Sequence, residues 1–277
     1  MKEAEAELRQ AGIDAAAAET EIILLSLLSI ERIDLYLHGA KLIDDEILGK
    51  FHDIVKKRAT RYPLQYILGE MWFYGRRFAV NQSVMVPTPE TEILCETAVH
   101  FIDFMGLNKA RVLDIGAGSG VIAVTVAGEI DDADVTAVDL SPDALEVARV
   151  NAETHGVADR ISLVCSDLFS AIIPHKQFDL ILSNPPYISE EEYKDLPPEV
   201  LADPKISLVA GEQGMDIIEA IVEKSPDYLA PSGRLIFEIG YNQADLVTKL
   251  TENDNRYISL TILRDLNDVD RVVMLGV

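Results

Sequence analysis

Four consecutive residues, Asn184-Pro185-Pro186-Tyr187, form the most distinctive chemical motif of the sequence. Proline has no backbone N–H and fixes its own φ angle, so the pair aims the neighbouring carbonyls rigidly and gives them no local donor. The Asn184 side-chain oxygen and the Pro185 carbonyl can then accept both hydrogens of one planar NH₂ group, while Tyr187 offers an aromatic face to a flat substrate. The motif predicts a substrate site that binds and orients an amide or an exocyclic base nitrogen.

A nitrogen of this kind is a weak nucleophile, because its lone pair is delocalised and no side chain can simply deprotonate it. Holding it in line with a reactive group in a dry site can supply up to roughly 7–11 kcal/mol of a barrier. Accepting the positive charge that develops on the nitrogen adds to this. We therefore expect Asn184, Pro185 and Tyr187 to be the catalytic residues and to act by positioning. An ordinary proline turn is the alternative interpretation.

A glycine-rich turn, Gly116-Ala117-Gly118-Ser119-Gly120, follows one predicted strand and begins a predicted helix. Glycine adopts backbone angles closed to other residues and lets a ligand approach the main chain. Asp139, at the end of the next predicted strand, can accept hydrogen bonds from both hydroxyls of a ribose. The turn alone also fits NAD or FAD, whose fingerprint is G-x-G-x-x-G. The G-x-G-x-G spacing found here favours S-adenosylmethionine, which has no pyrophosphate.

Asp167 and Leu168 follow the third predicted strand. Open α/β sheets bind ligands at the carboxyl ends of their strands. We expect Asp167 to face the adenine amine and the Leu168 backbone to lie beside the ring, with Asn184 against the cofactor at the end of the fourth strand. A helix cap is the alternative for Asp167.

The elements that position these residues alternate between apolar strands and helices from residue 110 onward. This pattern predicts the α/β class, with a Rossmann-like, mostly parallel sheet covered on both faces. The predicted strands span residues 111–115, 134–138, 161–165, 178–183, 234–239, 258–263 and 271–275. Too few residues separate the final two for a parallel crossover, so the last strand should be antiparallel.

Residues 1–71 have a different period. Apolar residues recur at three- and four-residue spacing through residues 13–28 and 43–54, which predicts a small helical bundle. Residues 72–88 contain aromatic and β-branched residues, Gly75 and an Asn81-Gln82 turn, which together predict a hairpin linker. Residues 89–277 then form the catalytic domain.

The net charge of −23 is unevenly distributed, because residues 91–277 carry 13 Lys and Arg against 33 Asp and Glu. A field that acidic repels phosphate backbones, so we expect no direct nucleic-acid binding. Local basic runs occur at Lys56-Lys57-Arg58 and at Arg76-Arg77. They are either solvated surface or a docking patch for an acidic or RNA-associated partner.

The chain begins with charged residues and contains no apolar run long enough to span a bilayer. We expect a cytoplasmic monomer that does not bind membranes. Cys95 and Cys165 lie in no Cys/His cluster, so no metal site is expected, and both should be buried thiols.

The two site motifs resemble those of class I methyltransferases that modify planar amino groups. The wider chain resembles the bacterial release-factor glutamine methyltransferases, the PrmC/HemK family, over nearly its full length. Thr88 stands where that family usually has Arg, and Leu168 where an aromatic residue is common. The matching segments are Arg61-Tyr62-Pro63-Leu64-Gln65-Tyr66-Ile67-Leu68-Gly69, Val86-Pro87-Thr88-Pro89-Glu90-Thr91-Glu92, Ala210-Gly211-Glu212-Gln213-Gly214-Met215-Asp216, Glu238-Ile239-Gly240 with Gln243, and Asp270-Arg271-Val272.

The resemblance implies a helical substrate-recognition domain (1–71), a hairpin linker (72–88) and a methyltransferase domain (89–277). It implies N5-methylation of the glutamine in a Gly-Gly-Gln loop of peptide-chain release factors, with S-adenosylhomocysteine as the second product. Carried over, Gly116 to Gly120 and Asp139 hold the cofactor, Asp167 and Leu168 flank the adenine, and Asn184 to Tyr187 bind the glutamine amide.

Three alternatives remain open. A ribosomal-protein glutamine methyltransferase shares the Asn-Pro-Pro-Tyr chemistry, and the Gln65 to Gly69 stretch argues against it by resemblance alone. An adenine methyltransferase must grip phosphates and flip its base, which the acidic catalytic domain disfavours. A non-catalytic nucleotide-binding module would bind the cofactor without transferring the methyl group.

Overall fold

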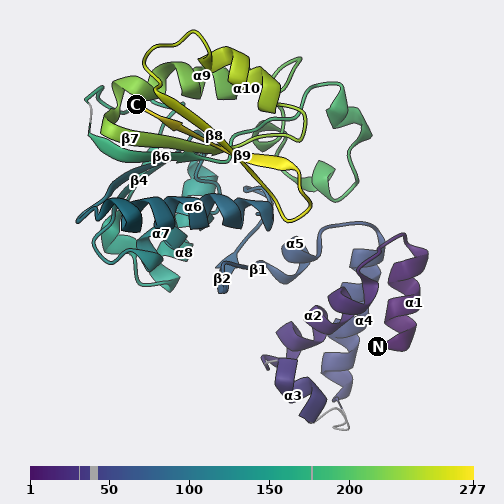
Figure 1. The fold of residues 1–277 in the computed structure, drawn as a ribbon. Coiled ribbons are helices and arrows are strands. Elements are labelled where there is room, and N and C mark those ends of the chain that lie inside the picture. The colour runs from purple at the N-terminus through teal and green to yellow at the C-terminus, as the bar shows by residue number, and fades with distance from the viewer. Residues whose placement is uncertain (31, 38–42, 176) are drawn as a thin grey trace. The chain divides into compact units, whose positions relative to one another are not determined.

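The computed structural model describes residues 1–30, 32–37, 43–175 and 177–277. The chain divides into two compact units, a smaller helical one and a larger one built on a sheet (Figure 1). The helical unit consists of Met1–Met71 with Pro197–Ala202, and the larger unit of Trp72–Leu196 with Asp203–Val277. A short segment from the second half of the chain is therefore part of the helical unit.

The helical unit is a small bundle, as the apolar spacing predicted. Its helices are α1 (Lys2–Gln10), α2 (Ala16–Leu28), α3 (Arg32–Leu37), α4 (Asp45–Ala59) and α5 (Leu64–Leu68). Leu8, Ile23, Phe51 and Val55 are nearly fully buried in its core. Asp44 caps α4 by accepting a hydrogen bond from the Ile47 N–H at 2.8 Å, which satisfies a donor that the first turn leaves open.

An ion-pair network fixes the segment Pro197–Ala202 within this unit. Arg58 on α4 is almost fully buried, and its guanidinium donates to Glu19 at 2.6 Å and to Glu199 at 2.9 Å. Arg61 donates to both oxygens of Glu199, at 2.6 and 2.7 Å. The opposing charges at these distances hold the pKa of Glu199 at about 2, although its partial burial acts in the other direction.

The larger unit contains a seven-stranded sheet in the order β5-β4-β3-β6-β7-β9-β8. Its strands are β3 (Arg111–Ile115), β4 (Asp134–Asp139), β5 (Ile161–Cys165), β6 (Phe178–Ser183), β7 (Leu229–Glu238), β8 (Ser259–Arg264) and β9 (Asp270–Gly276). The first five strands in this order pair in parallel, and β9 runs antiparallel to both β7 and β8. The prediction of a mostly parallel sheet with an antiparallel last strand is confirmed.

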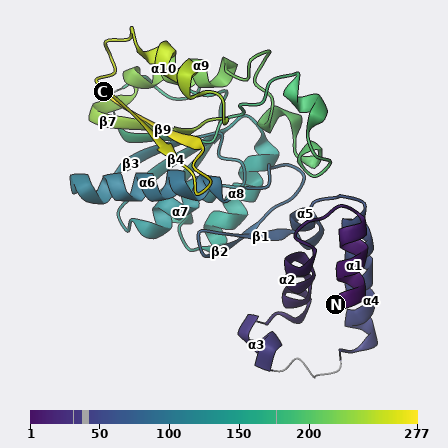
Figure 2. The same cartoon turned by 45° about the vertical axis from the view of Figure 1, so that its right-hand side comes forward.

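Helices cover both faces of the sheet (Figures 1 and 2). One face carries α6 (Glu90–Met105), α7 (Val121–Glu129) and α8 (Pro142–Thr154), and the other carries α9 (Asp216–Lys224) and α10 (Ala244–Thr251). Short 3-10 helices lie at Ala158–Arg160, Glu192–Asp195, Val200–Ala202, Lys205–Ser207 and Ser225–Asp227. Ser141 begins α8 as expected, accepting from the Ala144 N–H at 3.2 Å ahead of Pro142 in the first turn.

The small two-stranded sheet lies earlier in the sequence than predicted. It pairs β1 (Glu70–Phe73) with β2 (Arg76–Ala79). Tyr74 and Gly75, with φ of 49° and 69°, form the turn between the two strands, as in a type I′ hairpin turn, which needs positive φ at both positions. The expected turn at Asn81-Gln82 is present, but it follows the hairpin and does not connect its strands. Asn81 instead forms a local turn after β2, accepting from the Ser83 N–H at 2.8 Å.

Two further features bear on the expectations from sequence. Cys95 is buried, but Cys165 is exposed because β5 is an edge strand of the sheet, so the expectation of two buried thiols is wrong for Cys165. Among the residues that the structure describes, no helix combines the length and the apolar character needed to cross a membrane.

Candidate active site

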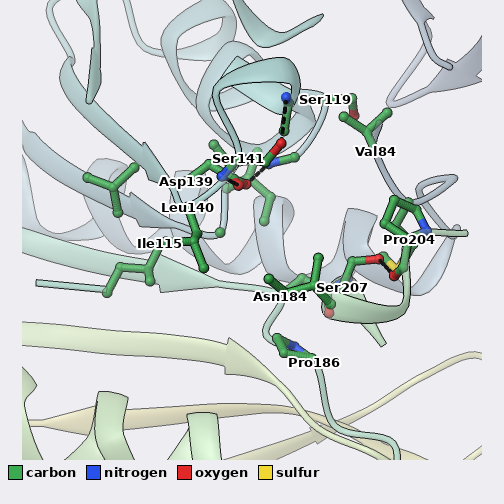
Figure 3. A pocket seen from close by; sticks show the side chains of 18 of the residues that line it. Val84, Ile115, Ser119, Asp139, Leu140, Ser141, Asn184, Pro186, Pro204 and Ser207 are labelled. Carbon is green, nitrogen blue, oxygen red and sulfur yellow. Dashed lines mark hydrogen bonds between the residues drawn. The ribbon is translucent and has the colours of Figure 1, made fainter. Parts of the chain in front are cut away.

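One cavity in the larger unit opens at the carboxyl ends of β3, β4 and β6, where an open α/β sheet binds its ligands (Figure 3). Its lining includes most of the residues singled out from sequence: Gly116, Ala117, Gly118, Ser119, Asp139, Asp167, Leu168, Asn184 and Pro186. Three of the predicted site residues, Gly120, Pro185 and Tyr187, do not line it. The fold thus brings the glycine turn and the Asn-Pro-Pro-Tyr motif to one space.

The glycine turn bends sharply between β3 and α7. Gly116, Gly118 and Gly120 all have positive φ, at 76°, 54° and 79°. The N–H groups of Gly116 and Ala117 both donate to the Val138 carbonyl on β4, at 2.8 and 2.9 Å. A Cβ on Gly120 would lie 3.0 Å from the Ala148 Cβ on α8, so this glycine allows close packing of two elements.

Asp139 holds the other side of this turn. Its Oδ2 accepts from the Gly118 N–H and its Oδ1 from the Ser141 N–H, both at 2.8 Å. A carboxylate has about four acceptor positions, so both oxygens keep capacity for the two hydroxyls of a ribose. Figure 3 shows Asp139 and Ser141 beside the pocket. The donor and acceptor set therefore fits a nucleoside with free hydroxyl groups.

Buried polar atoms without hydrogen bonds also mark this cavity. Among the described residues, Ser119 Oγ and Asn184 Oδ1 are buried and have no partner, and both residues line the cavity. Buried polar groups are normally paired, so each such atom needs an explanation. A ligand that places a hydrogen-bond donor against each of these two atoms would explain why they are unpaired in the protein alone.

The segment 166–171 forms the third side of the cavity. Ser166 Oγ donates to the Leu168 carbonyl at 2.8 Å and accepts from the Ala171 N–H at 3.0 Å. Leu168 has a φ of 48°, a conformation that costs energy for a residue with a side chain. Asp167 is exposed and follows β5 without capping a helix. Its expected contact with the adenine stays a prediction.

The Asn-Pro-Pro-Tyr segment leaves the sheet directly after β6. The last residue of β6, Ser183, is buried and donates to the Ile115 carbonyl at 2.7 Å, which ties the ends of β6 and β3 together. Asn184 Nδ2 donates to Thr91 Oγ1 at 2.9 Å. Figure 3 shows Asn184 and Pro186 on one side of the pocket and Asp139 on another.

Behind Asn184 lies a fully buried carboxylate, Glu238, the last residue of β7. Its Oε2 accepts from Thr91 Oγ1 at 2.8 Å, and its Oε1 accepts from the Tyr187 hydroxyl at 3.0 Å. Burial raises the pKa of Glu238 to about 7 despite these two hydrogen bonds. Burial and the nearby Glu238 charge also raise the pKa of Tyr187, so its hydroxyl remains a donor at neutral pH.

A second buried carboxylate, Asp114, lies beneath the glycine turn on β3. Its Oδ2 accepts from the Ala123 N–H on α7 at 3.1 Å, while its Oδ1 has no partner among the described residues. Burial raises its pKa to about 7, against the opposing effect of the Ala123 hydrogen bond.

The sequence reasoning assigned no role to Thr91, Glu238 or Gln243. Gln243 is buried, and its Nε2 donates to the Tyr187 carbonyl at 2.9 Å. Each residue lay inside a segment quoted for the family resemblance. The signal that could have singled out Glu238 is a carboxylate within the apolar run 235–239, because a charge in a buried strand is costly unless it serves a purpose.

The family models match both parts of the chain. The methyltransferase small domain matches residues 92–252, and the PrmC N-terminal domain matches residues 1–69. A solved structure, the hMettl16 catalytic domain in complex with the MAT2A 3′UTR hairpin 6, superposes with a TM-score of 0.57 at 15% identity. It covers 79% of this chain and 91% of that one, and the likeness concerns the fold alone.

Curated relatives match over almost the whole length. The release factor glutamine methyltransferase of Nitratidesulfovibrio vulgaris is 39% identical, with 99% of this chain and 92% of the relative covered. That of Cereibacter sphaeroides is 41% identical, with 96% and 93% covered. The resemblance inferred from the motifs is confirmed, and the chain belongs to the release factor glutamine methyltransferase family.

Proposed function

We propose that this protein methylates the side-chain amide nitrogen, N5, of the glutamine in the Gly-Gly-Gln motif of peptide-chain release factors. Membership of the family makes it a methyltransferase that uses S-adenosylmethionine. The observation that carries the choice of acceptor is the buried Asn184 Oδ1. This oxygen has no hydrogen bond within the described chain, and its residue lines the same cavity as Asp139 and the glycine turn.

The acceptor nitrogen must be held with its plane fixed. Asn184 Oδ1 would accept one hydrogen of the glutamine amide and the Pro185 carbonyl the other, because the two proline rings restrict the backbone and fix the direction of that carbonyl. An amide group fills both acceptors, whereas a hydroxyl has one hydrogen and fills only one. This requirement favours a planar NH₂ over serine, threonine or carboxylate acceptors.

When bound, S-adenosylmethionine supplies a methyl group on a sulfonium, which is already strongly electrophilic. The protein's contribution is to align the nitrogen and to stabilise the positive charge that develops on it. Held by the glycine turn and Asp139, the cofactor would give its methyl group to the nitrogen and keep the electron pair of the S–CH₃ bond. The nitrogen would give up one hydrogen as a proton to solvent water, leaving a neutral N-methyl amide.

Under this proposal, the residues on the cofactor side of the cavity bind S-adenosylmethionine. Asp139 accepts the ribose hydroxyls, the glycine turn admits the cofactor to the main chain, and Ser119 Oγ offers a further polar contact. Asp167 and Leu168 flank the adenine. The aromatic ring of Tyr187 supports the acceptor segment from behind, because its hydroxyl is bound to Glu238.

The helical unit is proposed to recognise the release factor. The match of residues 1–69 to the PrmC N-terminal domain supports this role, as do the names of the relatives. Direct contact with nucleic acid is not part of the proposal, since residues 91–277 are strongly acidic. One chain carries both the cavity and the helical unit, so no second copy is needed. We expect the reaction to take place in the cytoplasm, because release factors act in translation.

The proposal is tested with methyl-labelled S-adenosylmethionine and a purified release factor. Parallel reactions contain the same factor with the glutamine of its Gly-Gly-Gln motif changed to alanine, a ribosomal protein mixture, and DNA. We expect label on the unaltered release factor alone. Equal label on both forms of the release factor, or label on DNA or ribosomal protein in place of it, would show that the acceptor is misassigned.

A further inference from the structure

Glu238 does not line the cavity, yet the side-chain hydrogen bonds of both Asn184, through Thr91, and Tyr187 lead to it. It is absent from the cavity lining and fully buried at the end of β7. Its two oxygens each take one hydroxyl, Thr91 on α6 and Tyr187 after β6. Thr91 in turn is the partner of the Asn184 amide.

The hydrogens in the hydrogen bonds that link Glu238, Thr91 and Asn184 can be assigned by counting donors. Above about pH 7 Glu238 is ionised, and an ionised carboxylate only accepts, so the single hydroxyl hydrogen of Thr91 points at Glu238 Oε2. Thr91 Oγ1 then has only lone pairs to offer on its other side. Asn184 must turn its NH₂ toward Thr91, which leaves Oδ1 unpaired and available to an incoming amide.

We propose that Glu238 is the positioning residue of the methyl-transfer site, setting through Thr91 which way the Asn184 amide faces and holding the Tyr187 ring through its hydroxyl. The inference rests on the proposed function, since it explains how the acceptor of that reaction is oriented. Without an acceptor at position 238, the Thr91 hydrogen is left with Asn184 and with Thr88 Oγ1, which is 3.5 Å away. Nothing then fixes the Asn184 amide, which can turn over and present donors to a substrate NH₂ that is itself a donor.

Tyr187 is held at its side chain and at its backbone. Its hydroxyl donates to Glu238 at the end of β7, and its carbonyl accepts from Gln243 Nε2, just before α10. A Cβ on Gly214 would lie 2.2 Å from the Tyr187 carbonyl oxygen, so the backbone there is closely packed as well. The side chain therefore cannot swing to another position without breaking the hydrogen bond to Glu238.

The side chain at position 238 has to be a carboxylate for this purpose. A glutamine would offer one acceptor and one donor, so it can satisfy only one of the two hydroxyls in the observed direction. A carboxylate accepts from both at the cost of being buried. The groups that bear electrostatically on it are Thr91, Glu90 and Cys95 from α6, Tyr187 from the segment after β6, and Arg271 from β9.

The primary test replaces Glu238 with methionine, which has similar size and no strong acceptor, in the full-length protein. We expect kcat with a release factor to fall roughly 30- to 100-fold, consistent with loss of one electrostatic positioning group. The KM for the release factor and the calorimetric Kd for S-adenosylmethionine should change less than about threefold, because Glu238 lies outside the cavity and the orientation of one amide affects alignment for transfer more than the binding of either ligand. A variant with parental kcat overturns the inference.

Thr91 supplies a matched pair of variants. Thr91→Val removes the hydroxyl at constant shape and should reproduce the kcat loss, whereas Thr91→Ser keeps the hydroxyl and should retain kcat within about threefold. The Glu238→Met/Thr91→Val double variant should be no slower than either single variant, because both break one chain of hydrogen bonds. Losses that multiply would mean that the two residues act separately.

A spectroscopic readout is independent of turnover. The side-chain ¹⁵N–¹H₂ resonance of Asn184, identified by its absence in Asn184→Ala, should shift with a midpoint near pH 7 in the parent as Glu238 titrates. It should show no such step in Glu238→Met. A parent that labels no release factor but shows this step would overturn the proposed function and keep the positioning role. An active parent without the step, in which Glu238→Met also keeps the parental kcat, would keep the proposed function and overturn the positioning role.

Discussion

The two sides of the cavity are held by different kinds of bond. On the cofactor side, Asp139 binds the main-chain N–H groups of Gly118 and Ser141, which lie 21 and 2 positions away. On the acceptor side, Asn184 is held through side chains, by Thr91 at 93 positions and then Glu238 at 147 positions from Thr91. Hydrogen bonds to the main chain depend on the path of the backbone. A series of hydrogen bonds between side chains depends on the identity of each residue in it, so single substitutions on the acceptor side should change methyl transfer more selectively.

The largest effect is expected on the acceptor side. Asn184→Ala removes the unpaired oxygen that receives the substrate amide, and we expect methyl transfer to fall by about 10²–10³-fold, as when one preorganised polar group is removed from a reaction centre. Single-turnover labelling measures the loss, and calorimetry with S-adenosylmethionine serves as the control. Cofactor affinity should stay within a few-fold of the parent. Unchanged turnover would mean that Asn184 does not bind the acceptor.

Substitutions on the cofactor side should weaken the binding of S-adenosylmethionine more than they slow turnover. Asp139→Ala deletes the acceptor for the ribose hydroxyls and for two main-chain donors. We expect the Kd for S-adenosylmethionine to rise about 10- to 100-fold, since hydrogen bonds to a charged group contribute roughly 1.5–3 kcal/mol. Asp143→Ala, an exposed carboxylate in the first turn of α8, is the matched control and should leave the Kd unchanged. Equal effects would point to net charge as the cause.

The same contrast explains how much of the site could be predicted from sequence. The glycine turn and Asp139 follow consecutive strands, so the alternating pattern was enough to place them together. Asn184 was found because two adjacent prolines at a strand end are rare and have a direct chemical meaning. The roles of Thr91 and Glu238 were missed because nothing in the local sequence indicates that residues 147 positions apart share a hydrogen bond.

The fold shows the same division between local and long-range information. The mostly parallel sheet followed from the alternation of strands and helices and the antiparallel β9 from the short connection before it, and both were confirmed. The start of β7 was placed at residue 234, whereas the strand begins at Leu229, because Pro231-Ser232-Gly233 looks like a turn. Ser232 has a φ of 67°, and the pairing with β6 shifts register there, so the strand continues across an irregularity. Only the neighbouring strand makes this visible.

A third prediction separates packing from binding within the glycine turn. Gly120→Ala places a methyl group 3.0 Å from the Ala148 Cβ at a φ of 79°. Gly156→Ala has a similar φ of 68° with open space around it. Both should lose about 1–2 kcal/mol of unfolding free energy from the backbone conformation, and Gly120→Ala about 1–3 kcal/mol more from overpacking. Urea unfolding measures the difference. Equal losses would mean that α8 yields to the extra methyl group.

The smallest expected effect is on how the unfolding free energy depends on pH. The Glu238 carboxylate that supports methyl transfer should lower this free energy as pH rises. Burial raises the native pKa of Glu238 to about 7, above its ordinary value of 4.5. Between these values the folded protein holds more protons than the unfolded chain, so this group's contribution to stability falls as pH rises through that window. Asp114, whose pKa burial also raises to about 7, adds a fall of the same sign.

Glu238→Gln removes one of these two contributions. The difference in unfolding free energy, variant minus parent, should therefore increase by about 1–3 kcal/mol as pH rises from 5 to 8. Each unit of pKa shift corresponds to about 1.4 kcal/mol. Urea unfolding of both proteins at pH 5, 6, 7 and 8 measures the gain, and Asp143→Ala again provides the control. A variant that is more stable at pH 8 and slower in methyl transfer would show that the carboxylate is kept for orientation of the acceptor side. A variant that is less stable at pH 8 would show instead that Glu238 holds the fold together there.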